Sequence, residues 1–364
     1  KDSNKHILLG AVHKEKDKIY NAALLLAGGK IQSIVKKNIL PNYAVFDEMR
    51  YFAAGDEVGI ITIKSKKYAV LICEDLWDQE FINKLQAYQD LEAVFVLNAS
   101  PYEITKLSRR IEIAKNVSSR IKAPVIYVNQ IGGQDHLIFD GNSFVVNQDK
   151  LVRKLPSFEE SSLRINLSDI TKHKKSHKLA TDKDREIYNA LILSLRDYVQ
   201  KSSFDSVLVA MSAGIDSTLC AMLAIDALGK DKVGFVTMPS QHTSYETFFD
   251  ANEFFTRNKI TNFNNININQ IYDSVLAHLQ DLFLGKEADI TEENIQSRIR
   301  GLLIMALSNK FQKLVITTGN KSEVAVGYST LYGDTCGAFS LIKDIYKTQV
   351  FSLAKWRNRN IPKL

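Results

Sequence analysis

The sequence has few of the features that mark membrane-spanning, secreted or nucleic-acid-binding proteins. Its apolar runs stay well short of the roughly 18–20 residues that cross a bilayer, so we expect a soluble protein with no membrane partner. Only three cysteines occur (Cys73, Cys220 and Cys336), and their spacing fits neither a disulfide framework nor a zinc site. This usage indicates a reducing compartment, and we predict a cytoplasmic location. A net charge of only +6, without a dense basic block, argues against nucleic acid and suits anionic small molecules.

The length and the apolar content indicate two domains. A chain of 364 residues that is 45% hydrophobic can bury two cores. We predict one domain over residues 1–170, a linker over 171–183 and a second domain over 184–364. Apolar periodicity is poor around the linker, and its basic run 172–178 is best explained as a solvated surface. Residues 1–5 include no initiator methionine and look like a cut into a longer chain.

Short apolar runs separated by turns occupy much of the first 150 residues. They cover residues 6–10, 22–26, 68–72, 93–97 and 125–128. Unbroken apolar runs of this length are typical of strands that are buried on both faces. Helical patterns intervene near residues 79–88 and 106–121. The alternation predicts an α/β sandwich.

Cys73 directly follows the strand predicted at 68–72, and a strand end is where a rigid scaffold can present a nucleophile to a cleft. The alternative is a buried, inert cysteine, which is the commoner case. The presence of Lys37 favours the interpretation of Cys73 as a nucleophile. A lysine close to a cysteine favours the thiolate and can stabilise a tetrahedral oxyanion.

Several motifs around Cys73 together resemble the nitrilase-type glutaminase domain of glutamine-dependent NAD synthetases. They are Lys37-x-x-Leu40-Pro41-Asn42-Tyr43, Cys73-Glu74-Asp75, Asn98-Ala99-Ser100-Pro101-Tyr102, Asn129-Gln130-x-Gly132-Gly133-Gln134-Asp135 and Phe139-Asp140-Gly141-x-Ser143. The resemblance implies an α-β-β-α sandwich in which Cys73 attacks the glutamine carboxamide and Lys37 stabilises the oxyanion. It places four further residues in the glutamine pocket: Tyr43, Trp77, Ser100 and Lys106.

The chain departs from that family pattern at two points. The family triad also contains a glutamate general base, and neither Glu15 nor Glu48 stands in its motif. We therefore expect this base upstream of residue 1, in a domain that is truncated at its start. His136 also stands where the family often has an acidic residue.

The second half is organised around residues 212–217, which lie between the apolar run 207–211 and a helical pattern. A strand that ends in a Gly/Ser turn and opens a helix directs backbone N–H groups at one anion. Asp216 fits beside a phosphate only if a cation bridges them. The alternative is an ordinary turn with Asp and Ser as caps. The stretch resembles the Ser-Gly-Gly-x-Asp-Ser signature of PP-loop ATP pyrophosphatases, with Ala213 replacing a glycine, which is strained if its φ is positive.

Strands and helices continue to alternate after this loop, which argues for a doubly wound parallel sheet. We predict strands at 233–238 and near 265–268, with a helix over 247–257 between them. Ligands of such sheets bind at the carboxyl ends of the strands, so Thr237 and Met238 are placed to meet an adenine or a ribose. A second strand–turn–helix, 314–323, adds Glu323, and two carboxylates that converge on a triphosphate imply Mg²⁺.

Residues 184–356 resemble the NAD synthetase domain through four further motifs. These are Glu293-Asn294-Ile295-Gln296-x-Arg298-Ile299-Arg300, Thr318-Gly319-Asn320-Lys321-Ser322-Glu323, Gly327-Tyr328-x-Thr330-Leu331-Tyr332-Gly333-Asp334 and Lys343-Asp344-x-Tyr346-Lys347-Thr348. The resemblance implies ATP contacts from Ser212, Ala213, Gly214, Ile215, Asp216, Ser217, Met238 and Thr318. It implies Mg²⁺ at Asp216 and Glu323, and deamido-NAD contacts from Asn294, Arg298, Glu323, Tyr328, Ser329, Thr330, Leu331 and Asp334.

The two resemblances imply an enzyme that amidates deamido-NAD with ammonia from glutamine, through an adenylate, releasing AMP and pyrophosphate. We expect a homo-oligomer whose contacts complete an internal ammonia route. Three alternatives stay open: another PP-loop amidating or tRNA-modifying ATPase, a non-catalytic nucleotide-binding protein, and a synthetase that uses only free ammonia. The family also continues past Leu364, so the carboxyl end is expected to be truncated too.

Overall fold

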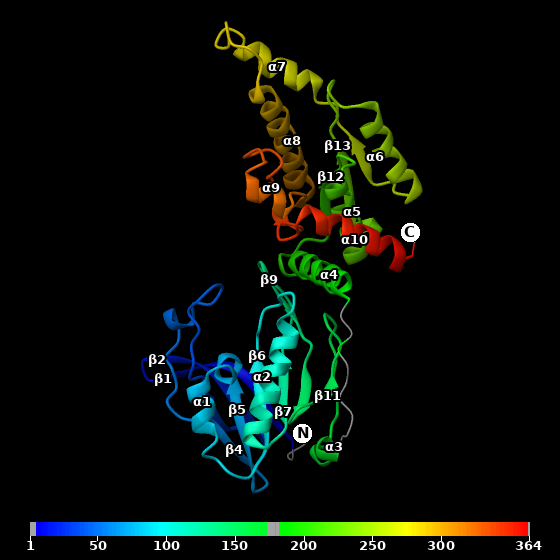
Figure 1. The fold of residues 1–364 in the computed structure, drawn as a ribbon. Helices are drawn as coiled ribbons and strands as arrows, with labels where there is room; N and C mark the ends of the chain where they lie inside the picture. The colour runs from blue at the N-terminus through cyan, green and yellow to red at the C-terminus, as the bar shows by residue number, and fades with distance from the viewer. Residues whose placement is uncertain (1–4, 173–178, 180–181, 363–364) are drawn as a thin grey trace. The chain divides into compact units, whose positions relative to one another are not determined.

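The computed structural model describes residues 5–172, 179 and 182–362. Contacts divide the chain into two compact units, Lys1–Gly132 with Leu137–Thr181, and Gly133–His136 with Asp182–Leu364. Figure 1 shows the first unit from blue to green and the second from green to red. Most of the predicted basic run, 173–178, lies outside the described residues.

The first unit is built around a six-stranded mixed sheet in the order β11-β10-β7-β6-β5-β4. Its strands are β4 (Ile60–Ile63), β5 (Lys66–Ile72), β6 (Leu91–Asn98), β7 (Val125–Asn129), β10 (Phe144–Asn147) and β11 (Lys150–Lys154). The central strands β5, β6 and β7 are parallel, and the flanking pairs are antiparallel. Parallel strands are buried on both faces, which explains why their apolar runs were visible in the sequence.

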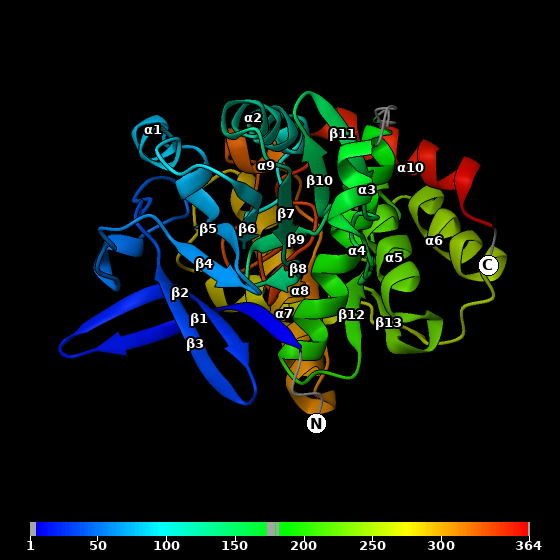
Figure 2. The ribbon, with the colours of Figure 1, turned by 90° about the horizontal axis from the view of Figure 1, so that it is seen from below.

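Different layers cover the two faces of this sheet. Helices α1 (Gln79–Leu85) and α2 (Lys106–Ile121) pack on one face, where Phe81, Ile111 and Leu71 share a core. A second, antiparallel sheet of β1 (His6–Glu15), β2 (Lys18–Ala27) and β3 (Lys30–Lys36) packs on the other face. Figure 2 shows these three strands as the long blue ribbons beside β4 and β5. The short helix α3 (Leu167–Lys172) packs through Ile170 on β10 and β11.

The predicted nitrilase-like α/β architecture is confirmed, but one strand assignment needs correction. The run 6–10 does form a strand, yet β1 is mostly exposed rather than buried on both faces. The reason is that β1 is the edge of a small antiparallel sheet and, among the described strands, pairs only with β2. A separate hairpin of β8 (Ile131–Gln134) and β9 (Leu137–Asp140) carries His136 in its exposed turn.

The second unit contains a five-stranded sheet in which every pairing is parallel. Its order is β14-β13-β12-β15-β16, with β12 (Val207–Ala210) at the centre. The other strands are β13 (Val233–Thr237), β14 (Phe263–Asn265), β15 (Leu314–Thr317) and β16 (Phe339–Ser340). The chain leaves β12 toward β13 on one side and returns as β15 on the other, so the loop after β12 lies at the topological switch point.

Helices cover both faces of the parallel sheet, as the doubly wound prediction requires. One face packs against α4 (Lys183–Lys201), α5 (Ile215–Leu228), α6 (Tyr245–Arg257) and α10 (Lys347–Asn360). The other packs against α7 (Asn269–Leu279) and α8 (Ile290–Phe311). The short helix α9 (Lys321–Val326) follows β15. The strand predicted near 265–268 is misplaced: β14 ends at Asn265, and Ile268 caps α7. Among the described helices, none combines the length and apolarity needed to span a bilayer.

Candidate active sites

Cys73 lies where β5 ends and a short 3-10 helix, Cys73–Leu76, begins. Its φ of +50° is in the left-handed region, which non-glycine residues seldom adopt. The turn places Cys73 at the end of β5, where it borders the core between the two sheets and lines a cavity. The residue is only 9% exposed, so its thiol lies in a confined space.

Lys37 and Glu48 form an ion pair in the same cavity as Cys73. The Lys37 ammonium donates to both Glu48 carboxylate oxygens at 2.7 Å. Its side chain is 1% exposed, whereas that of Glu48 is 19% exposed. The sequence alone does not pair Glu48 with Lys37, because Glu48 does not stand in the family's triad motif. The only sequence feature that points to the pair is the position of Phe46-Asp47-Glu48 shortly after the lysine motif.

Burial controls the ionisation of the Cys73 thiol. Burial raises its pKa to about 11, and the nearby Lys37 ammonium opposes that rise. The carboxylates of Glu74 and Glu48 raise the pKa further. The expectation that Lys37 favours the thiolate therefore holds for its direction, but desolvation is the larger effect. At neutral pH the Cys73 thiol is protonated and needs a base to become a nucleophile.

The space around Cys73 is a cavity of about 760 Å³. Lys37, Glu48 and Cys73 line it together with Asn98 and Asn129. The rest of the described lining is largely apolar and includes Leu25, Ile61, Ile72, Phe95 and Ile126. A small number of polar groups in an apolar pocket is typical of a small-molecule site.

The four residues predicted to bind glutamine are not among those that line this cavity. Tyr43 is 56% exposed, and its hydroxyl donates to Glu74 Oε1 at 2.8 Å. Trp77 is half-buried beneath the Arg109 guanidinium. Lys106 lies 3.6 Å from Glu103. Ser100 is 3% exposed, so its contacts are internal, and the glutamine-binding roles of all four stay predictions.

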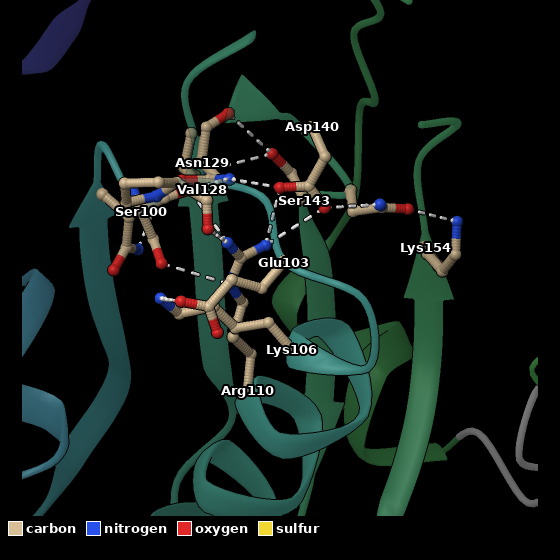
Figure 3. A network of polar contacts seen from close by, with 12 residues as sticks. Ser100, Glu103, Lys106, Arg110, Val128, Asn129, Asp140, Ser143 and Lys154 are labelled. Atoms are coloured by element: carbon tan, nitrogen blue, oxygen red, sulfur yellow. Dashed lines mark hydrogen bonds and ion pairs between the residues drawn. The ribbon is translucent and has the colours of Figure 1, made fainter. Parts of the chain in front are cut away.

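Ser100 belongs to a buried polar network that the sequence did not reveal (Figure 3). Arg110 Nη1 donates to Asp140 at 2.8 Å and 3.1 Å. Its other nitrogens reach the Ser100 hydroxyl at 3.2 Å and the Ser100 carbonyl at 2.8 Å. Asn129 Oδ1 accepts from the Ser100 backbone N–H at 2.9 Å. A charge pair this deeply buried is maintained by its hydrogen bonds, and it fixes the segment that carries Ser100.

The predicted phosphate loop follows β12, and its backbone leads into α5 with Gly214 as the N-cap. The Ser212 and Ser217 hydroxyl oxygens are 3.1 Å apart, and Ser217 also donates to the Gly214 carbonyl at 3.0 Å. Ile215 is the first residue of the helix. The loop thus combines hydroxyl donors with the positive end of a 14-residue helix, as an anion site requires.

A cavity of about 560 Å³ lies against this loop. Twelve of its lining residues come from the predicted site or its motifs: the predicted residues Ser212, Gly214, Asp216, Ser217, Asn294, Thr318, Glu323, Tyr328, Ser329, Thr330 and Asp334, together with Glu293, which precedes Asn294. Four of them are carboxylates, and the described lining contains no lysine or arginine. An acidic cavity beside a phosphate loop is electrostatically suited to a phosphate only when a cation accompanies it. Ala213, Ile215, Arg298 and Leu331 do not line this cavity.

Asn320 connects the two carboxylates that we predicted to hold Mg²⁺. Its side-chain amide donates to Asp216 Oδ1 at 3.0 Å, and its backbone N–H donates to Glu323 Oε2 at 3.2 Å. Lys347 pairs with the second Asp216 oxygen. Among the described residues, no cluster of three or more His, Cys, Asp or Glu could hold a metal ion. Two carboxylates nevertheless fit Mg²⁺, which is commonly bound by one or two carboxylates plus substrate phosphates.

Helix α8 supports the loop that contains residues 327–335. Thr330 Oγ1 donates to Asn294 Oδ1 at 2.8 Å, and the Asp334 N–H donates to Ser297 Oγ at 3.1 Å. Arg298 Nε donates to the Leu331 carbonyl at 3.3 Å. Arg298 and Leu331 therefore hold the loop from outside the cavity, and their contacts with deamido-NAD stay predictions.

A third cavity, of about 420 Å³, lies at the ends of β12 and β13. Thr237 and Met238 line it, as expected for residues at the carboxyl end of a strand. Arg300 also lines it, and its Nε donates to the Met238 carbonyl at 3.0 Å. Ser212 lines both this cavity and the acidic one, so the phosphate loop adjoins both.

Ala213 has a φ of +61°, the strained case that the sequence raised. We expect Ala213→Gly to increase the free energy of unfolding of the second unit by about 0.5–1 kcal/mol. Alanine is strained by about 1–2 kcal/mol in the left-handed region, and glycine relieves this strain. Part of the gain is offset because glycine has more conformational entropy to lose on folding. The measurement is urea unfolding in the absence of nucleotide. The transition that belongs to the second unit is identified beforehand as the one that moves to higher urea when ATP is added. Ala227→Gly, inside α5, is the control and should lose about 1 kcal/mol. A lower stability for Ala213→Gly would show that the methyl contact with the core matters more than the strain.

Comparison with known proteins adds to this geometry. Residues 1–175 match the carbon-nitrogen hydrolase family, and residues 187–364 match the NAD synthase family. The chain is 44% identical over 359 residues to the glutamine-dependent NAD(+) synthetase of Acinetobacter baylyi, covering 97% of this chain and 65% of that protein. It is 39% identical over 388 residues to that of Thermotoga maritima, covering 97% and 67%.

A solved structure agrees over nearly the whole chain. The glutamine-dependent NAD+ synthetase from Acinetobacter baumannii, in complex with adenosine diphosphate, matches with a TM-score of 0.90 at 42% identity, covering 97% of this chain and 68% of that one. The chain thus spans about two thirds of the length of such relatives. These identities and coverages show that the chain belongs to the glutamine-dependent NAD(+) synthetases.

Proposed function

We propose that this chain carries both halves of a glutamine-dependent synthesis of NAD⁺ from deamido-NAD. One observation supports this above all: a Cys73–Lys37–Glu48 cavity in the first unit and an acidic phosphate-loop cavity in the second occur in one chain. The first is suited to release ammonia from a carboxamide. The second is suited to activate a carboxylate with ATP.

In the proposed glutaminase step, Cys73 Sγ adds to the carboxamide carbon of glutamine after its proton has passed to a base. Lys37 stabilises the negative charge that develops on the carbonyl oxygen. The base then returns the proton to the amide nitrogen as the C–N bond breaks, so that ammonia leaves and a thioester remains. Water, activated by the same base, hydrolyses the thioester to glutamate and the free thiol. Glu48 keeps the Lys37 ammonium in place for this role, because both of its oxygens accept from it.

In the proposed synthetase step, the nicotinate carboxylate attacks the α-phosphorus of ATP and pyrophosphate leaves. Ammonia then attacks the acyl carbon, and AMP leaves. The loop amides and hydroxyls of Ser212 and Ser217 bind phosphate oxygens, and the third cavity takes the adenosine between Met238 and Arg300. Asp216 and Glu323 would hold Mg²⁺, which would supply positive charge against the phosphates.

The proposal extends to compartment and assembly. All three cysteines are free, as in a protein of the reducing cytoplasm. Free ammonia is mostly protonated at neutral pH, so an enclosed route favours the reaction. We propose a homo-oligomer whose subunit contacts complete such a route, with no nucleic acid partner.

Assays of the full-length protein with two nitrogen donors test the proposal. NAD⁺ formation from deamido-NAD, ATP and Mg²⁺ is measured with glutamine or with ammonium, alongside pyrophosphate release with and without deamido-NAD. We expect NAD⁺ from both donors and pyrophosphate release that depends on deamido-NAD. Release that is independent of deamido-NAD would favour another PP-loop ATPase, and ATP binding without turnover would favour a nucleotide-binding protein. Activity from ammonium alone would restrict the proposal to the second unit.

A further inference from the structure

Asp75 is a buried carboxylate that contacts two separate segments of the first unit. Its Oδ1 accepts from the backbone N–H of Asn38 at 3.1 Å and of Ile39 at 2.8 Å. Its Oδ2 accepts from the backbone N–H of Ile72 at 3.0 Å. The side chain is 1% exposed and does not line the cavity around Cys73. Asp75 is therefore placed to act on the arrangement of the site rather than on a substrate.

The two segments that Asp75 connects are those that carry the candidate nucleophile and the candidate oxyanion lysine. Asn38 and Ile39 directly follow Lys37, and Ile72 directly precedes Cys73. Asn38 and Ile39 precede Asp75 by 37 and 36 residues in the chain, so the relative position of the two segments depends on tertiary contacts. The backbone of Lys37 is also held by β2, since its N–H donates to the Asn21 carbonyl at 2.8 Å. Asp75 adds the direct connection to the Cys73 turn.

A carboxylate suits this position because all three of its partners are donors. An ionised aspartate only accepts, whereas an asparagine must present an amide N–H₂ to one of the two segments. Burial nevertheless disfavours the charge and raises the pKa of Asp75 to about 6, while the three backbone N–H groups and Lys37 oppose the rise. An apolar residue at this position would leave three backbone N–H groups without this acceptor, so the carboxylate holds the two segments together at the cost of a buried charge.

We propose that Asp75 is a positioning residue of the glutaminase site, which sets the distance between the Lys37 ammonium and the Cys73 thiol through the backbone on each side. The proposal rests on the proposed glutaminase function. It predicts a loss of rate rather than of glutamine binding, because Asp75 does not reach the cavity. A displacement of about 1 Å between reacting groups reduces rates by about 100-fold.

Asp75→Asn in the full-length protein tests the proposal, because it keeps the shape of the side chain and replaces one of its two accepting oxygens by an N–H₂ donor. We expect kcat for glutamine-dependent NAD⁺ formation to fall about 100-fold, with KM for glutamine changed less than threefold and the ammonium reaction unchanged. A second readout needs no turnover: the rate at which iodoacetamide alkylates Cys73 between pH 7 and 9. Displacing Lys37 removes the charge that lowers the thiol pKa, so alkylation at a given pH slows, by about tenfold for each unit that the pKa rises.

Asp78→Ala is the matched control. Asp78 lies in the same turn and caps α1 by accepting from the Phe81 N–H at 2.7 Å, but it makes none of the Asp75 contacts. Its replacement weakens the unit without moving Lys37, and we expect kcat and the alkylation rate to stay within twofold of wild type. Similar losses in both variants, or none in Asp75→Asn, would overturn the proposal.

The direction in which the alkylation rate changes distinguishes a displaced Lys37, which slows the reaction, from an unfolded first unit, which speeds it up. If Asp75→Asn unfolds the first unit, Cys73 becomes an ordinary exposed thiol and reacts faster, which would assign Asp75 a structural role and also overturn the proposal. If the wild-type chain makes no NAD⁺ from glutamine, the proposed glutaminase function fails. The alkylation comparison would still report whether Asp75 holds Lys37 near Cys73.

Discussion

Replacing Cys73 by alanine is expected to abolish NAD⁺ formation from glutamine and to leave formation from ammonium intact. In the proposed glutaminase step the carboxamide C–N bond breaks through a covalent intermediate on the Cys73 sulfur, and alanine offers no nucleophile. We expect the glutamine-dependent kcat to fall by about 10⁴-fold or more, as for other covalent nucleophiles. Ammonium bypasses this step, so its rate reports whether the second unit remains folded and active. The measurement is NAD⁺ formation with each donor, at saturating deamido-NAD, ATP and Mg²⁺.

Cys220→Ala is the control for this experiment. Cys220 is fully buried in α5, in the core of the second unit, and lines none of the three cavities. Its replacement removes a thiol from the chain without touching the first unit, and both donors should still give NAD⁺. If Cys73→Ala kept its glutamine reaction, the nucleophile would lie elsewhere. If it lost both reactions, Cys73 would be needed for more than ammonia release.

Cys73 and Lys37 line one cavity, and each could be singled out because it lies in a short local pattern; their catalytic roles stay predictions. Cys73 follows an apolar run that became β5, and Lys37 begins a compact motif. Contacts that depend on the path of a loop were not visible. Glu48 reaches Lys37 only because the intervening chain folds back, and no periodicity marks such a turn. The same holds for Arg110 and Asp140, which come from α2 and β9 and meet only in the folded core.

The second unit was predicted more completely, since its fold repeats one simple pattern. Each parallel strand is followed by a polar turn and a helix, so side chains after neighbouring strands converge at one edge. This places Asp216 after β12 and Glu323 after β15 in one cavity. The position of β14 was wrong because its three residues are exposed and two of them are asparagines, so the strand lacks the apolar signal of the inner strands. Ala213 could be identified as a departure from the motif, but its strain depended on a φ angle that only the fold sets.

Asp216→Asn is expected to reduce NAD⁺ formation by about 1,000-fold with glutamine and with ammonium alike, because positive charge held beside the phosphates contributes several kcal/mol to such reactions. Asparagine keeps the size of the side chain and can still accept from Asn320, but it loses the negative charge that would share Mg²⁺ with Glu323. The same loss leaves Lys347 without its ion-pair partner. The measurement is the initial rate with each donor as a function of Mg²⁺ concentration.

The dependence on Mg²⁺ separates this explanation from a general weakening of the fold. If Asp216 binds the ion, the concentration that gives half-maximal rate should rise in Asp216→Asn, whereas a damaged fold would lower the rate at every concentration equally. Asp231→Asn, an exposed aspartate between α5 and β13, removes the same charge away from the cavities and should leave both quantities unchanged. An unaltered Mg²⁺ requirement in Asp216→Asn would leave Glu323 as the carboxylate that matters. Because Asn320 contacts both carboxylates, Glu323→Gln with the same titration would then decide whether either side chain binds the ion.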